Sequence, residues 1–167
     1  MATSTLVQFL SSGEGGDTSN RRQVETFFAG GAIAAGDWVA LDNSKTGADR
    51  CLYVVEAAGV ATKGNAAAMG VALAAAAADE RVDVVVAGYV ASASVAAATV
   101  AGDALVGPIG TAGRAEIEVP GTTTGNVCGI ALEADTANFA ACLVTKPYCT
   151  LPGHGRSVPC PPGRPPF

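Results

Sequence analysis

The chain has 167 residues, which is enough for one domain with a core of its own. Its net charge is −5, and only Arg21 and Arg22 among its 10 basic residues are adjacent. Affinity for nucleic acid comes largely from Lys and Arg side chains that neutralise phosphates, so binding to DNA or RNA is not expected. The longest apolar stretch, residues 66–78, is interrupted by Gly70 and falls short of the roughly 18 to 20 residues of a membrane span.

Charged residues make up 15% of the chain, against roughly 25% in an ordinary soluble domain. Much of the 49% hydrophobic content is alanine, and only 5% of the residues are aromatic, so a typical core side chain buries little area. Such a composition suits a protein that packs against itself or against neighbours. Residues 1–8 lack the basic and long apolar regions of a secretion signal, so synthesis in the cytoplasm is expected.

Composition divides the chain into three parts. Residues 1–20 are polar and glycine-rich without periodicity, which predicts a flexible N-terminal arm. A β-rich body is expected over residues 21–149, because an alternating pattern begins there with Val24, Thr26 and Phe28. Residues 150–167 are rich in proline, which favours an extended tail without a core of its own.

The body consists of short apolar runs separated by glycine turns. Many β-branched runs at close spacing predict an all-β fold, either a single β-sandwich or a barrel. The run Ala74–Ala78 is too short for a stable helix and lies between strand-like segments, so we expect a helical turn or a compact corner there. After the first strand, the expected strands are 38–41, 51–55, 70–73, 81–86, 104–106, 115–119, 127–132 and 140–145.

An internal repeat is the most informative feature of the body. Ala-Gly-Asp-Trp-Val-Ala-Leu at 35–41 matches Ala-Gly-Asp-Ala-Leu-Val at 101–106, and Gly-Val-Ala-Leu at 70–73 matches Gly-Ile-Ala-Leu at 129–132. A further apolar strand follows in each half. Asp37 and its counterpart in the second copy are explained by hydrogen bonding within a turn.

The repeats span about 29–90 and 95–148 and predict two pseudo-symmetric halves of one body. The strand at 38–41 is expected to occupy the same place as the strand at 104–107. The strands at 71–73 and 130–132 are expected to be equivalent in the same way.

Candidate nucleophiles and metal ligands are few. The one histidine, His154, lies in the proline-rich tail, away from any nucleophile that the body could hold beside it. Cys149, His154 and Cys160 could reach one metal ion, but no CxxC pair and no fourth ligand accompanies them. A Cys149–Cys160 disulfide in an oxidising medium is an alternative. Cys128 and Cys142 lie in apolar runs and are expected to act as small hydrophobic residues.

Acidic residues occur together at Asp79, Glu80 and Asp83, and Glu116 and Glu118 share one face of an expected strand. A glycosidase needs two carboxylates in a cleft lined by aromatic side chains, and no aromatic cluster accompanies these acids. They are expected to form solvated faces. The sequence therefore predicts no catalytic residue, no cofactor, no metal site and no enzyme activity.

The repeated segments, together with Arg-Val-Asp-Val-Val-Val-Ala-Gly-Tyr-Val at 81–90, resemble a family of phage head proteins described as capsid cement or decoration proteins. Members of that family are small β-rich proteins with a Gly-Asp-x-Val, a Gly-Val-Ala-Leu and a Val-x-Val-x-Gly strand. The resemblance covers about residues 29–148. It implies a structural protein on the outside of the capsid that binds the major capsid protein and stabilises the shell. The proline-rich tail is not part of the family's pattern.

A homo-oligomer is expected, a trimer first and a dimer second, because association would offset the small core and capsid lattices offer threefold and twofold positions. Alternation over residues 82–86 places Val85 outward beside Asp83, which would leave apolar surface for a partner. The alternative function is a carbohydrate- or host-surface-binding β module of a fibre or adhesin. That function would need an exposed aromatic platform among Trp38, Tyr53 and Tyr89.

Overall fold

A computed structural model of the chain describes residues 22–59, 64–65, 67–119 and 125–149. The expected arm at 1–20 and the expected tail at 150–167 lie outside the described residues. The described part holds nine strands and one short 3₁₀ helix. These are β1 (Gln23–Ala29), β2 (Trp38–Leu41), η1 (Gly47–Cys51), β3 (Tyr53–Glu56), β4 (Ala68–Ala72), β5 (Arg81–Ser94), β6 (Ala104–Val106), β7 (Glu116–Ile117), β8 (Asn126–Ala131) and β9 (Phe139–Cys149).

The first five strands close into a small barrel, called the first barrel below. β1 pairs with β3, β3 with β2, β2 with β4 and β4 with β5, and β5 returns to pair with β1. All of these pairs are antiparallel except β1–β3. The predicted all-β fold is confirmed, and its architecture is a barrel, one of the two alternatives that the strand pattern allowed.

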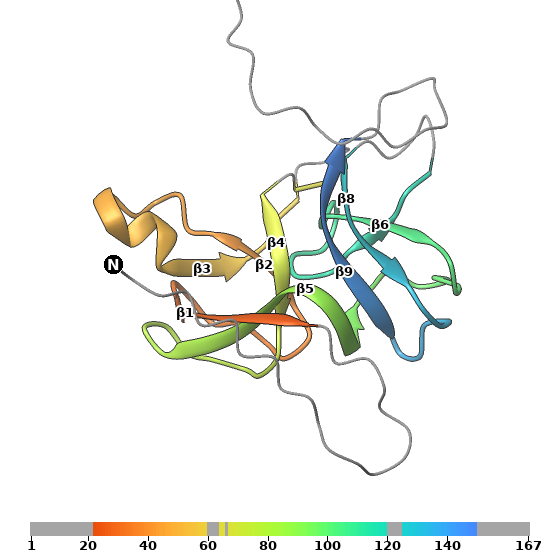
Figure 1. The fold of residues 1–167 in the computed structure, drawn as a ribbon, viewed down its shortest axis with the longest axis horizontal. Helices are drawn as coiled ribbons and strands as arrows, with labels where there is room; N and C mark the ends of the chain where they lie inside the picture. Colours follow the sequence, from red (N-terminus) through yellow and green to blue (C-terminus); the bar gives the residue numbers. More distant parts are fainter. Residues whose placement is uncertain (1–21, 60–63, 66, 120–124, 150–167) are drawn as a thin grey trace, which may run out of the picture.

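The long strand β5 links the first barrel to a second ring of strands. Gly88, with a φ of +102°, lies where β5 stops pairing with β1 and begins to pair with β9. The order then runs β9, β8, β6 and β7, and a parallel bridge between Val95 and Ala115 connects the end of β5 back to the start of β7. We call this ring the second barrel. Figure 1 shows β1 and β3 on one side, β6, β8 and β9 on the other, and β4 and β5 between them.

The two barrels have the same strand register. β2 pairs with β4 as β6 pairs with β8, with a register shift at the same point, and β4 pairs with β5 as β8 pairs with β9. Both strand pairs that the repeat predicted to be equivalent are therefore equivalent. The matching pairs are Trp38–Val71 with Ala104–Ile130, Val39–Gly70 with Leu105–Gly129, Ala40–Ala68 with Val106–Val127, and Val71–Val85 with Ile130–Leu143.

The Ala-Gly-Asp turns that lead into β2 and β6 also match. Asp37 accepts a hydrogen bond from the amide of Ala34 at 2.8 Å, and Asp103 accepts one from the amide of Val100 at 2.8 Å. The glycine before each aspartate has a positive φ, +87° in the first turn and +95° in the second, which other residues rarely adopt. The interpretation of these aspartates as turn residues is confirmed.

The alanine run Ala74–Ala78 forms a corner and contains no helical turn. Ala76 exchanges two backbone hydrogen bonds with Ile33, of 2.9 and 3.0 Å, and these bonds hold the corner against the segment after β1. The η1 helix was not expected, and it ends at Cys51, where the sequence predicted the start of a strand. These differences concern local geometry and leave the strand order unchanged.

The body has two buried apolar clusters. One fills the first barrel with inward side chains such as Val39, Val54, Val82 and Val84. The other combines the interior of the second barrel with side chains from the outer face of the first, and Val85 belongs to it. Val85 is fully buried, so the prediction that it is exposed was wrong, because the second barrel covers the outer face on which it lies. The core members on the second-barrel side include Val95, Leu105, Ala115, Cys128, Ala131, Ala140, Cys142 and Val144.

Candidate functional site

Two of the acidic residues singled out in the sequence, Glu80 and Asp83, accept hydrogen bonds within a turn and across a strand pair. Glu80 accepts a hydrogen bond from the amide of Ala77 at 2.8 Å, within the turn before β5. Asp83 accepts one from the hydroxyl of Thr26 at 2.6 Å across the β1–β5 pair, and it is exposed. Both acids therefore accept hydrogen bonds that stabilise the local turn and the strand pair.

A pair of carboxylates that the sequence did not suggest lies near the junction of the two barrels. A Cβ atom at Gly113 would be 2.7 Å from Oε1 of Glu56 and 2.8 Å from Cγ of Asp37, so both side chains converge on this glycine. Burial raises the pKa of Asp37, and the hydrogen bond from Ala34 opposes that shift. Burial also raises the pKa of Glu56, and the neighbouring charge of Asp37 raises it further. Only the register of β2 with β3 brings Glu56 there, which no local signal in the sequence reveals.

The two cysteines inside the second barrel are chemically quiet. Cys128 and Cys142 are free and buried. Burial raises the pKa of the Cys142 thiol to about 12, and it raises the pKa of Cys128 as well. Cys51, by contrast, is exposed.

Among the residues that the structure describes, no three His, Cys, Asp or Glu side chains are grouped as a metal site would require. The suggested ligands His154 and Cys160 lie outside the described residues. In the same described part of the chain, no helix has the length and apolar character that a membrane crossing needs.

Among the described aromatic residues that carbohydrate binding was expected to use, Trp38 and Tyr53 do not present an open ring, and Tyr89 is half-buried. Trp38 is fully buried, and its indole N–H donates a hydrogen bond to the carbonyl of Ser94 at 3.0 Å. Tyr53 is half-buried and packs against Phe28 with ring centroids 5.5 Å apart. The ammonium of Lys45 lies 4.2 Å from the centre of the Tyr53 ring, so this ring already has a cation over it.

Trp38 joins the two barrels. It leaves the outer face of the first barrel, and its ring reaches β8, where a Cβ at Gly129 would be 2.9 Å from Cη2 of the indole. Ser94, which accepts its hydrogen bond, ends β5 in the second barrel. One side chain therefore contacts both the strand that the barrels share and a strand of the second barrel.

The feature best suited to bind a partner is a row of side chains across the outer face of each barrel. In the first barrel the row follows the pairs Val24–Val85, Val85–Val71 and Val71–Trp38, and we call it the first outer row. Its last three members are fully buried beneath the second barrel. The sequence predicted the apolar alternation of these residues but not that the second barrel buries them.

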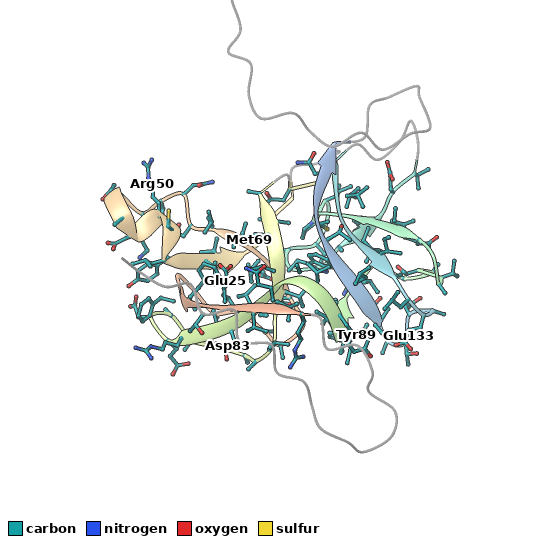
Figure 2. All side chains as sticks on the ribbon, in the orientation of Figure 1. Glu25, Arg50, Met69, Asp83, Tyr89 and Glu133 are labelled. Carbon is teal, nitrogen blue, oxygen red and sulfur yellow. The ribbon has the colours of Figure 1, made fainter. Side chains whose placement is uncertain are left out.

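The second outer row occupies the corresponding place on the second barrel. It follows the pairs Tyr89–Leu143, Leu143–Ile130 and Ile130–Ala104. Ile130 is 36% exposed and Leu143 is 37% exposed, whereas their counterparts Val71 and Val85 are 0% exposed. Figure 2 shows Tyr89 on the side of the second barrel, beside β9. An apolar row that is covered in one barrel is thus open to solvent in the other.

Comparisons with known proteins give little further information. No model of a known protein family matches the chain, and no curated protein matches it. Among solved structures, the chain is similar to the head fiber gp8.5 N base of bacteriophage phi29, with a TM-score of 0.48 and 17% identity. The match covers 74% of this chain and 94% of that chain.

Proposed function

We propose that the chain is a structural protein of a phage head that binds the outer surface of the capsid and stabilises the shell by bridging major capsid subunits. The proposal includes no catalytic step, no cofactor and no nucleic acid. The protein is made in the host cytoplasm and resides on the capsid exterior.

One observation carries the proposal. The Gly-Asp, Gly-(Val/Ile)-Ala-Leu and apolar strand segments, by which the chain resembles cement proteins, form the same paired strands in both barrels. The residues that carry the resemblance therefore lie in the paired strands that form each barrel. A closed barrel also removes free strand edges, which suits a protein that must contact neighbours without aggregating.

The test is electron microscopy of particles from the source of this sequence. Density for the double barrel at regular positions on the outside of the shell supports the proposal. Absence of the chain from the particles, or its location in the phage tail alone, contradicts the proposal.

A reconstitution experiment tests the expected role of the chain ends. Particles that lack the chain are incubated with the purified full chain or with variants that lack residues 1–20 or 150–167. The two truncations are expected to bind the shell more weakly while the body remains folded. Equal binding by all three proteins would show that the ends are not the anchors. A thermal-disruption assay on the same particles measures whether the bound chain stabilises the shell.

The alternative of a carbohydrate- or host-surface-binding module gains no support from Trp38 or Tyr53. Trp38, the largest of them, is buried, and Tyr53 lies under a lysine. Specific binding of the purified chain to glycans, with none to particles, would favour the alternative over the capsid role.

A further inference from the structure

We infer that the second outer row, formed by Tyr89, Ala104, Ile130 and Leu143, is an interface at which a second copy of this chain docks. The inference does not depend on the capsid role, because it concerns only contacts between copies of this chain. The two barrels have matching strand registers, so the structure around the first outer row indicates what kind of surface can cover the second outer row. The first outer row is covered by a barrel of the same repeat, namely the second barrel of the same chain.

The side chains of the second outer row are larger than those of the first at the two central positions. Ile130 replaces Val71 and Leu143 replaces Val85, yet both are more than a third exposed. Two more exposed apolar side chains flank the β8–β9 connection, Leu132 directly after β8 at 46% and Phe139 at the start of β9 at 40%. Contiguous exposed apolar surface of this kind marks interaction sites on soluble proteins.

The second outer row carries no charge, which favours a copy of itself as the partner. The chain has a net charge of −5, so two copies repel one another overall, and a contact surface without charged side chains adds nothing to that repulsion. A contact between two second outer rows brings no charged pair together within the row and buries apolar area on both sides, with Glu133, which accepts a hydrogen bond from the amide of Ala141 at 3.0 Å, near the row. Charge depletion at the centre of the contact is typical of protein interfaces.

A head-to-tail contact, in which the second outer row packs on the first barrel of the next copy, is disfavoured by one residue. Within the chain, Val90 lies in the buried cluster that covers Trp38 and Val85. Glu25 occupies the corresponding place in the first barrel, because it pairs with Val84 as Val90 pairs with Cys142. Glu25 is exposed, and burying its carboxylate beneath an apolar row would carry a desolvation cost. The contact is therefore row to row, an isologous contact that closes as a twofold dimer and forms no filament, so it favours the dimer over the trimer that was expected first.

The experiment measures the mass of the full chain by sedimentation equilibrium over a wide range of concentrations. The test variant is Ile130→Thr with Leu143→Thr, because threonine is favoured in strands and adds a hydroxyl, and at position 130 it keeps the β-branched shape. The control variant is Leu73→Thr, which changes a leucine of the first barrel that is also 37% exposed. Circular dichroism and thermal unfolding establish that all three proteins are folded.

The wild-type chain and the Leu73→Thr control are expected to form the same oligomer. The double variant is expected to be folded and to dissociate with a Kd raised roughly 100-fold or more, since the apolar surface is lost from both copies. If the double variant does not fold, hydrogen exchange of the wild-type chain replaces it, and amides of β8 and β9 should become more protected as concentration rises. A wild-type chain that stays monomeric at every concentration overturns the inference. So does a folded double variant with the wild-type mass.

Discussion

Replacing Trp38 by alanine tests whether the two barrels depend on one another for stability. Trp38 is fully buried, and removing a buried tryptophan side chain costs about 3–5 kcal/mol through lost burial and the cavity that remains. The carbonyl of Ser94 keeps a second donor, the amide of Ala115 at 3.0 Å, so loss of the indole N–H adds about 1 kcal/mol or less. We therefore expect a loss of about 3–6 kcal/mol, a large part of the roughly 5–15 kcal/mol that stabilises a typical domain.

The assay is urea unfolding followed by far-ultraviolet circular dichroism, because the variant lacks the one tryptophan of the chain and fluorescence is lost. Trp38→Phe keeps a ring at the joint and is expected to lose roughly half as much, about 2 kcal/mol. Leu52→Ala is the control, since Leu52 is 48% exposed and its truncation should cost about 0.5 kcal/mol or less.

The cooperativity of the unfolding transition should change as well. The Trp38→Ala protein should unfold less cooperatively than the wild type, because the interior of the second barrel loses part of its cover. A loss below about 1 kcal/mol, or a loss equal to that of the Leu52 control, would refute the role of Trp38 as the link between the barrels.

Two further predictions concern the junction carboxylates and the thiols. Glu56→Gln should stabilise the protein by about 1 kcal/mol or less at neutral pH, because the folded state raises the pKa of Glu56 and disfavours its charge. A carboxyl whose pKa is raised by folding contributes to stability below its ordinary pKa of about 4.3, where it is protonated. This contribution is lost as pH rises through the raised pKa of the folded state. The stability gained by the variant should therefore vanish near pH 4. The gain should shrink in an Asp37→Asn background, and a gain of equal size at every pH contradicts this account. Iodoacetamide should modify Cys51 in the native protein and the two buried cysteines only after unfolding, as peptide mass spectrometry can show. Rapid native labelling of Cys142 would contradict the burial described above.

The sequence by itself determined the all-β class, the approximate position of every strand and the equivalence of the two halves. Strand signals are local, since β-branched alternation and Gly-Asp turns depend only on neighbouring residues. The repeat then indicated which strands share a place, because the same motif folds into the same pairing. For the strand that became β5, the sequence suggested an end near Val86, whereas the structure extends it to Ser94 through Gly88.

Only the tertiary structure decided which outward side chains are covered. Val85 and Leu143 lie at the same register position and have similar local sequences, yet one is fully buried and the other is 37% exposed. The difference comes from what lies opposite, a second barrel in one case and solvent in the other. The meeting of Asp37 with Glu56 at Gly113 has the same origin, because residues far apart in the chain become neighbours only when the barrels close. Local pattern sets the direction of a side chain, and packing at long range sets its burial.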